Sequence, residues 1–154
     1  MQDPRLEEFS AAANFFMEEW PTVLRPWGFT RTAGKIHGLL LVSPNPMTTD
    51  EMLASTGASR GGMSDQLKVL INAGLVERLR ILGQRQDQYV AVQDGLLIQQ
   101  ALTSHWKAIT LQPMQLMEAS LAAIADKSDL HWLEAINRLR LALKTGPQLD
   151  HRTN

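Results

Sequence analysis

The sequence contains no cysteine, and it has neither a long apolar run nor a strong excess of one charge. Without cysteine, disulfide bonds, thiol redox sensing and metal sites built on thiolates are excluded. The longest aliphatic run, Leu39 to Val42, is far too short to cross a bilayer. The first residues lack an apolar run behind a basic end, so no signal peptide is expected and the predicted location is the cytoplasm.

The chain does contain enough apolar residues for a folded domain, since 44% of its 154 residues are hydrophobic. Its length suits one domain better than a two-domain enzyme. The net charge of −1 alone argues against nucleic-acid binding, but residues 24–92 carry eight basic and five acidic side chains. That region is therefore at +3 and the remainder at −4. Such a distribution is typical of a protein that binds nucleic acid through one face.

A short helix is predicted to follow Thr48. The spacing of Thr48 and Glu51 is that of a capping box, in which each residue satisfies a backbone N–H of the other. The helix starts at about Thr49 and ends at Gly57, because glycine readily adopts the left-handed conformation that terminates a helix.

A second helix is predicted after a tight turn, with Ser59 as its cap. Its buried face is indicated by residues at spacings of four and three, namely Met63, Leu67 and Leu70. The opposite face is polar and shows Gly61, Ser64, Asp65, Lys68 and Asn72. Such a face can offer donors and acceptors to base edges and can attract phosphate.

Gly61 and Gly62 are unusual inside a helix, where each costs about 1 kcal/mol relative to alanine. One interpretation is that a large group, such as a phosphate backbone, approaches the first turn closely. A frayed helix start is the other interpretation.

A β-hairpin is predicted after this helix, because residues 78–81 alternate and residues 88–92 have the composition of a partner strand. The loop 82–87 places Arg85 near the tip. An arginine on a projecting hairpin can enter the narrow minor groove of DNA, whereas in isolation it would be an ordinary solvated side chain. The order helix, turn, helix, strand, loop, strand predicts a mainly α (α+β) fold, a winged helix-turn-helix with a two-stranded wing.

The N-terminal residues predict a helix that starts at Pro4 and has an apolar seam, formed by Leu6, Phe9, Ala13, Phe16 and Trp20. Pro21 and the Pro26-Trp27-Gly28 segment are expected to break it. A further short helix, from Thr32 or Ala33 to Val42, would be the first helix of the DNA-binding core.

The C-terminal part predicts further apolar helices, with Asp94 opening one and Pro113 restarting it. Ser128 would cap a last helix that ends at Gly146. These helices have more apolar stripes than a domain of this size can cover, so a homodimer built from the terminal helices is expected. A self-contained bundle packed on the core is the alternative.

Several short motifs between residues 34 and 92 occur together in one known family. They are Gly34-Lys35-Ile36-His37-Gly38-Leu39-Leu40-Leu41, Ser43-Pro44, Thr48-Thr49-Asp50-Glu51, Ser59-Arg60-Gly61, Gly74-Leu75-Val76 and Gly83-Gln84-Arg85. Through them the chain resembles the winged-helix regulators related to the multiple-antibiotic-resistance (MarR) repressors, in particular the branch of the glycine betaine synthesis repressor (GbsR). In that branch an acidic residue often precedes the wing arginine and a basic one follows it, whereas Gln84 and Gln86 stand here.

The pattern and the resemblance together predict a homodimeric DNA-binding transcriptional regulator, a repressor, at a pseudo-palindromic operator in double-stranded DNA. The expected domains are an N-terminal dimerisation helix (1–24), the winged helix-turn-helix (32–92), a C-terminal helical dimerisation region (94–145) and a tail (146–154). The expected DNA-binding residues are Ser59, Arg60, Gly61, Gly62, Ser64, Asp65, Lys68 and Arg85. A winged helix that binds a protein partner and never meets DNA is the alternative.

Other chemistry has less support in the sequence. No metal-ligand spacing is found among His37, His105, His131 and His151, and no nucleophile or phosphate-loop motif is present. Neither enzymatic activity nor a cofactor is expected. An effector pocket could be lined by Trp20, Trp27 and Trp106, and the resemblance makes a choline-like ligand conceivable, since tryptophan faces suit quaternary ammonium groups. A core position is the ordinary role of such tryptophans.

Overall fold

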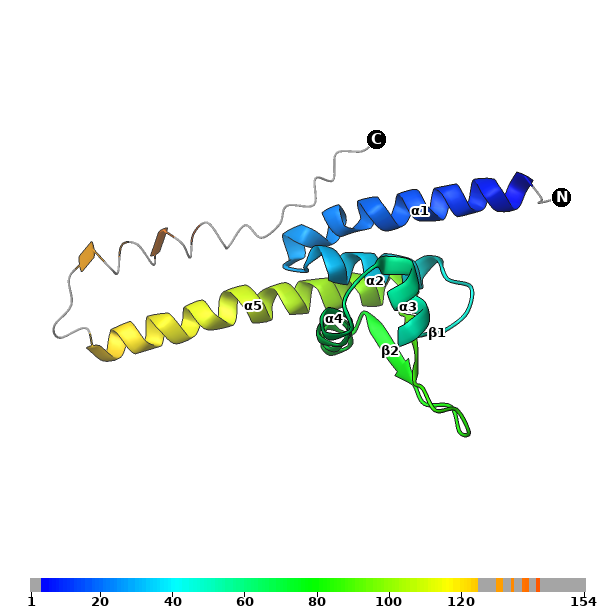
Figure 1. Ribbon diagram of the computed structural model, residues 1–154. Helices are drawn as coiled ribbons and strands as arrows, with labels where there is room; N and C mark the ends of the chain where they lie inside the picture. Colours follow the sequence, from blue (N-terminus) through cyan, green and yellow to red (C-terminus); the bar gives the residue numbers. More distant parts are fainter. Residues whose placement is uncertain (1–3, 125–129, 132–133, 135–136, 139–140, 142–154) are drawn as a thin grey trace. The chain divides into compact units, whose positions relative to one another are not determined.

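A computed structural model of the chain (Figure 1) describes residues 4–124, 130–131, 134, 137–138 and 141. By their contacts the residues form two units, Met1–Thr103 and Ser104–Asn154. In chain order the elements are α1 (Pro4–Leu24), the 3-10 helix η1 (Arg25–Trp27), α2 (Arg31–Val42), β1 (Met47–Thr48), α3 (Thr49–Thr56), α4 (Arg60–Ala73), β2 (Val76–Leu79), β3 (Gln88–Ala91) and α5 (Gly95–Ile124). The first unit holds every element up to the start of α5.

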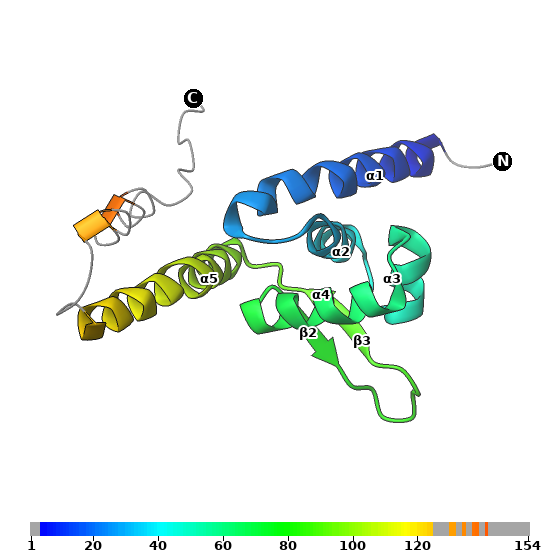
Figure 2. The same cartoon turned by 60° about the vertical axis from the view of Figure 1, so that its left-hand side comes forward.

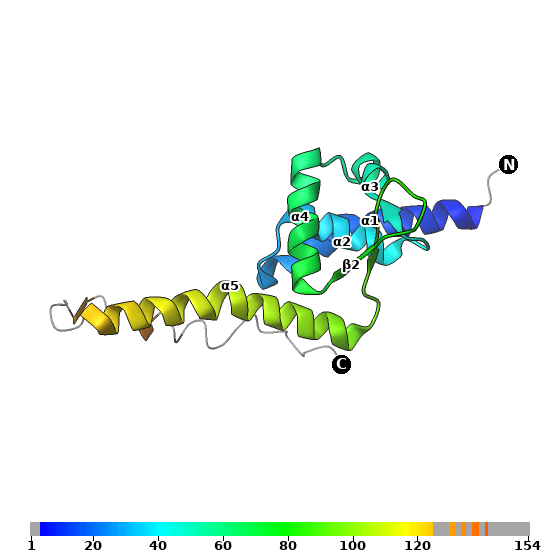
Figure 3. The same ribbon diagram turned by 90° about the horizontal axis from the view of Figure 1, so that it is seen from below.

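Helix α2 is the centre of the first unit, and it packs against α1, α3, α4 and β3. It begins at Arg31, slightly earlier than predicted, because the Thr30 hydroxyl accepts a hydrogen bond from the backbone N–H of Ala33 (3.1 Å) and so caps the helix. Ala33 and Ile36 on this helix are fully buried. Figure 3 shows α4 crossing α2.

The prediction that Pro21 ends the first helix is wrong, since α1 continues through Pro21 to Leu24. Proline removes one backbone donor from a helix. Pro21 is nevertheless buried against α2, at a place where a Cβ on Gly34 would lie 2.5 Å from the Pro21 Cα atom. This close packing of α1 on α2 (Figure 2) offsets the lost hydrogen bond, and the chain turns only after η1, where Gly28 has a φ of 91°.

The predicted core face of α4 is confirmed, because Met63, Leu67 and Leu70 are all buried. The core of the first unit also contains other buried apolar side chains, among them Leu24, Ile36, Met52, Leu75 and Val76. The burial of these side chains fixes α4 with its polar face outward, which positions the candidate site described below.

The sheet has three antiparallel strands in the order β1-β3-β2, whereas only the hairpin was predicted. β1 has two residues, too few for any alternation, and it exists only because Met47 pairs with Tyr89 and Thr48 with Gln88. β2 starts at Val76 and ends at Leu79, earlier than predicted, so the wing loop runs over residues 80–87. The predicted mainly α (α+β) winged-helix fold is confirmed.

Helix α5 starts as predicted, since Asp94 Oδ1 accepts from the backbone N–H groups of Leu96 (2.9 Å) and Leu97 (3.0 Å). The predicted restart at Pro113 is wrong, because α5 is continuous through that residue; a proline inside a helix removes one hydrogen bond but does not oblige the helix to end. The predicted ends of the last helix, Ser128 and Gly146, lie outside the described residues. None of the described helices is long and apolar enough to cross a membrane.

Candidate nucleic-acid interface

The two helices α3 and α4 are held in a helix-turn-helix by the predicted caps. The backbone N–H of Thr48 donates to Glu51 Oε2 (2.7 Å) and the backbone N–H of Glu51 donates to Thr48 Oγ1 (3.4 Å). The hydrogen bond from the Thr48 backbone holds the pKa of Glu51 below its usual value, because it stabilises the carboxylate. Gly57, with a φ of 68°, ends α3, and the Ser59 hydroxyl accepts from the backbone N–H of Gly62 (3.1 Å) at the start of α4.

The outward face of α4 carries the predicted DNA-contacting side chains, and all of them are exposed. They are Arg60, Ser64, Asp65 and Lys68, with the cap Ser59 and Gly61 beside them. Lys68 lies 3.9 Å from Asp65 one turn earlier, a loose and solvent-screened pair. The surface is therefore polar and of mixed charge, as predicted from the spacing.

The two glycines of the first turn of α4 differ in what surrounds them. A Cβ at Gly61 would meet nothing within 4 Å, so no part of the described chain requires glycine there. A Cβ at Gly62 would lie 3.0 Å from the Ser59 Oγ, so the capping bond itself limits that position. The first turn is helical and capped, and the absence of a side chain at Gly61 leaves space for a group outside the chain.

The wing carries an exposed arginine between two glutamines. The backbone N–H of Gln84 donates to Ile81 O (3.1 Å), and Gly83 has a φ of 87°, as in a type II turn. Arg85 is exposed and makes no side-chain hydrogen bond or ion pair with any residue that the structure describes. Its neighbours are both bonded, because Gln88 Nε2 donates to Gln84 Oε1 (3.2 Å) and Gln86 Nε2 donates to Asp50 Oδ2 (2.8 Å).

Three residues of this surface, Asp50, Arg78 and Tyr89, were not predicted from the sequence. Asp50 accepts from both Arg60 and Gln86. Arg78 of β2 donates through Nε to Asp87 Oδ2 (2.6 Å), and this hydrogen bond raises its pKa above the usual value. Arg78 and Tyr89 line a hollow of about 290 Å³ beside α4, together with Thr49, Ser64, Leu67, Lys68 and Ile71. The only sequence signal was the outward position of Arg78 in the alternating strand.

The chemistry of this surface suits a polyanion. Two cations and three hydroxyl groups surround the hollow, and cations with hydroxyl donors are the groups that usually hold phosphate oxygens of DNA. No group of three or more histidine, aspartate or glutamate side chains that could hold a metal ion occurs in the described part of the chain.

The three tryptophans of the predicted effector pocket have different surroundings. Trp20 is half-buried, stacks on Phe16 with ring centroids 5.0 Å apart, and donates through Nε1 to His37 Nδ1 (3.0 Å). Trp27 is buried in the core of the first unit, whereas Trp106 belongs to the second unit. That these three residues form one pocket stays a prediction.

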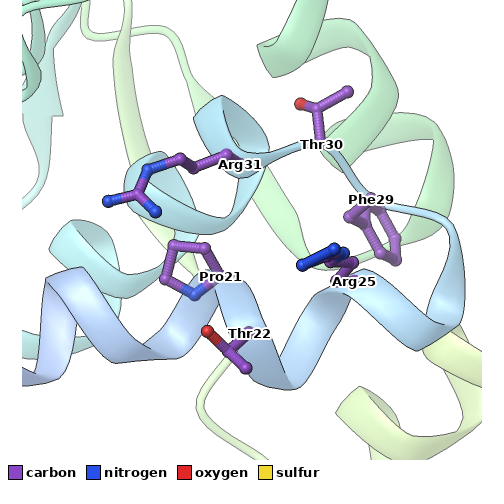
Figure 4. Close-up of a pocket in the computed structure, with 6 residues that line it drawn as sticks. All are labelled: Pro21, Thr22, Arg25, Phe29, Thr30 and Arg31. Carbon is purple, nitrogen blue, oxygen red and sulfur yellow. The ribbon is translucent and has the colours of Figure 1, made fainter.

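A cavity of about 300 Å³ lies where α1 ends and α2 begins (Figure 4), and none of the tryptophans that the structure describes lines it. Its lining residues are Pro21, Thr22, Arg25, Phe29, Thr30 and Arg31. Thr30 Oγ1 donates to Gln66 Oε1 (2.7 Å), so one wall of this cavity is bonded directly to α4.

Comparison with known proteins gives similar chains among bacterial regulators. No protein-family model matches this chain. The putative HTH-type transcriptional regulator YvaV of Bacillus subtilis (strain 168) is 28% identical over 94 residues, 61% of this chain and 53% of that protein. The HTH-type transcriptional regulator MmpR5 of Mycobacterium tuberculosis (strain ATCC 25618 / H37Rv) is 33% identical over 75 residues, 48% of this chain and 46% of that protein.

One relative is described as a repressor, the HTH-type transcriptional repressor OpcR of Bacillus subtilis (strain 168), which is 28% identical over 94 residues, 61% of this chain and 51% of that protein. This chain thus spans about half the length of the curated relatives that it matches. A crystal structure of a transcriptional regulator has a TM-score of 0.64 at 24% identity and covers 86% of this chain and 88% of that one, a likeness that shows the fold. In fold and in part of its sequence, the chain is therefore similar to helix-turn-helix transcriptional regulators.

Proposed function

We propose that the protein is a homodimeric transcriptional regulator, a repressor, that binds a pseudo-palindromic operator in double-stranded DNA. The observation that carries this proposal is the placement of the start of α4 and the wing on one surface, since Arg60 and Gln86 are both bonded to Asp50. A helix with an exposed polar face beside a projecting hairpin is the arrangement by which winged helices contact DNA. Within the MarR-like regulators, the motifs quoted above favour the branch of the glycine betaine synthesis repressor.

The proposed contacts divide between the two grooves. Ser59, Arg60, Ser64, Asp65 and Lys68 would meet the major groove. Gly61 and Gly62 would let the phosphate backbone approach the first turn of α4, which the open space around Gly61 supports. Arg85 would enter the minor groove, and its lack of a side-chain partner among the described residues leaves its guanidinium available.

A homodimer is proposed because large apolar side chains are exposed on helices outside the winged helix. They include Phe15 of α1 at 70% exposure, and Ile109, Leu116 and Met117 of α5 at 46%, 70% and 54%. A second copy of the chain would cover such faces and would supply a second α4 related by a twofold axis. Because residues 24–92 have a net charge of only +3, two copies acting together would be needed for strong DNA binding.

DNA binding is expected to weaken steeply as salt rises, with two chains bound per operator. Gel shifts on genomic fragments near the gene for this protein, with light scattering of the complex, measure both. Arg60→Ala and Arg85→Ala should each reduce the slope of log affinity against log salt by about 2 per bound dimer, if each arginine neutralises one phosphate, because each substitution removes that arginine from both chains. Lys107→Ala is the charge-matched control, because Lys107 is exposed on the second unit and is not a proposed contact.

The alternative function, a winged helix that binds only a protein partner, predicts a different result. It requires no DNA binding even at low salt, and that outcome would refute the regulator. Equal slopes for the wild type and both arginine variants would instead refute the assigned contacts.

We also propose that a small molecule modulates DNA binding. Trp20, Trp27 and Trp106 remain the proposed contacts, with a choline-like cation as the first ligand to try. The Thr30–Gln66 hydrogen bond supports coupling between the end of α1 and α4, because a shift of Thr30 would displace Gln66 of α4.

The expected result for an effector is a change in tryptophan fluorescence together with a change in DNA affinity. Choline and a panel of small anionic and cationic metabolites would be titrated against the free protein and against its DNA complex. If neither quantity moves for any compound of the panel, the effector hypothesis is rejected.

A further inference from the structure

We propose that Asp50 is a positioning residue that holds the wing against the start of α4 and so sets where Arg85 stands relative to the reading helix. The part of this inference that concerns DNA rests on the proposed function. The part that concerns the wing does not, because it is a statement about the free protein.

Asp50 has one separate donor for each oxygen of its carboxylate. Its Oδ1 accepts from Arg60 Nη1 (3.2 Å) on α4, and its Oδ2 accepts from Gln86 Nε2 (2.8 Å) in the wing. The two contacts therefore do not compete with each other. Asp50 itself lies in the first turn of α3, where a carboxylate is favoured by the helix dipole, so one side chain joins three parts of the winged helix.

The wing loop has little else to hold it in place. Residues 80–86 are all exposed, so burial does not orient them. The ion pairs of Asp87 with Arg78 and Arg80 and the bond between Gln84 and Gln88 stay within the hairpin. Throughout the described ranges, the structure gives this loop no other side-chain hydrogen bond or ion pair to a helix. Among the described residues, the Gln86–Asp50 hydrogen bond is therefore the one that joins the loop to the helix-turn-helix.

This arrangement orients Arg85 without touching it. Arg85 lies between Gln84, which is bonded to β3, and Gln86, which is bonded to α3. With both neighbours bonded, the backbone of Arg85 has less conformational freedom, while its side chain has no partner among the described residues. A loop released from Asp50 would lose this constraint on one side and would have to be ordered again when DNA binds, at a cost in affinity.

The direction in which DNA affinity changes when Asp50 is substituted separates this positioning role from a simple repulsion between its carboxylate and DNA. Removing a carboxylate from a DNA-facing surface removes a repulsion and would tighten binding. Removing the hydrogen bonds that hold the wing in place would instead weaken DNA binding. Asp50→Ala is expected to weaken DNA binding about threefold to tenfold, the effect of losing one typical hydrogen bond. Glu77→Ala is the charge-matched control, since Glu77 is exposed on β2, and its DNA affinity should be unchanged or tighter.

Gln86→Ala tests the wing contact alone and does not alter the first turn of α3. It should weaken DNA binding in the same direction as Asp50→Ala. The double variant should bind no more weakly than Asp50→Ala, because the second substitution removes a bond that is already lost. Asp50→Asn keeps an acceptor oxygen for Gln86, so it should recover at least part of the lost affinity.

Amide hydrogen exchange of residues 80–87 in the free protein gives a readout that does not involve DNA. These amides should exchange faster in Asp50→Ala and in Gln86→Ala than in the wild type, and at the wild-type rate in Glu77→Ala. If the wild type binds no DNA, the proposed function fails, while the exchange rates still decide whether Asp50 holds the wing. Unchanged exchange in Gln86→Ala, or DNA affinity in Asp50→Ala equal to or tighter than wild type, would overturn the inference.

Discussion

Alanine in place of Gly34 is expected to destabilise the first unit by about 1–3 kcal/mol, the usual cost of overpacking a tight core. The new Cβ would lie 2.5 Å from the Cα of Pro21 and 2.8 Å from its Cβ. These atoms belong to the backbone and to a rigid ring, so no rotation of a flexible side chain can relieve the clash. Helix α1 would have to move away from α2.

That movement would strain the other contacts between the two helices. Glu18 of α1 accepts from Arg31 (2.8 Å) and Lys35 (2.7 Å) of α2, and Trp20 donates to His37. The Glu18 pairs are exposed and contribute little in water, so the loss of apolar packing would dominate the measured change.

Chemical denaturation followed by tryptophan fluorescence measures this effect. Gly61→Ala is the matched control, because its Cβ would meet nothing within 4 Å and alanine is favoured in a helix by up to about 1 kcal/mol. Gly34→Ala should lower the midpoint of unfolding and Gly61→Ala should leave it unchanged or raise it. A Gly34→Ala protein as stable as the wild type would mean that α1 does not pack on α2 this closely.

A fall in pH from 7 to 5 is expected to cost about 2 kcal/mol of stability through His37 alone. His37 is fully buried, and burial lowers the pKa of its imidazole from the usual 6.5 to about 4. Its Nδ1 accepts from Trp20, and its Nε2 is buried without a hydrogen-bond partner among the described residues. The folded protein therefore keeps this imidazole neutral.

Stability falls with falling pH because His37 binds a proton more readily in the unfolded chain than in the folded one. Between pH 6.5 and pH 4 the unfolded chain binds a proton at His37 and the folded chain does not. The stability that depends on neutral His37 is therefore fully present above about pH 6.5, and it is lost as the pH falls towards 4. Glu18 and Glu51 have pKa values lowered from 4.5, so the stability linked to their carboxylates is lost mainly as the pH falls below about 4.5.

His37→Leu isolates this contribution, because leucine does not titrate. The absolute stability of the variant will differ, since Trp20 loses its acceptor, so the quantity to compare is the change in unfolding free energy between pH 7 and pH 5. That change should be smaller in His37→Leu than in the wild type by about 2 kcal/mol. Equal changes in the two proteins would show that His37 is protonated normally in the folded state.

Local sequence signals predicted the helix-turn-helix closely. Thr48, Gly57 and Ser59 act through hydrogen bonds and backbone angles within three or four residues of themselves, so their effect can be derived without knowledge of the rest of the fold. The buried face of α4 was equally local, because spacing alone identifies one side of a helix. Its opposite face, with most of the proposed DNA contacts, followed directly.

The wing of the candidate site was only partly predictable. The hairpin and the exposed Arg85 followed from alternation and composition. The partners of its neighbours did not, because Asp50 and Gln86 are 36 residues apart in the chain and no pattern links them. The hollow beside α4 likewise needs α3, α4 and the sheet to be placed together before Arg78 and Tyr89 become part of it.

By itself, then, the sequence determined those features that depend on neighbours along the chain: the caps, the turn, the amphipathic faces and the hairpin. Only the tertiary structure decided the features that depend on contacts between distant segments. Pro21 stays inside α1 because it packs closely against Gly34 of α2. β1 exists because it pairs with β3. Asp50 bonds to the wing because α3 and the hairpin lie side by side. The physical reason is that capping and periodicity are short-range, whereas packing and strand pairing acquire their free energy only when the whole first unit has assembled.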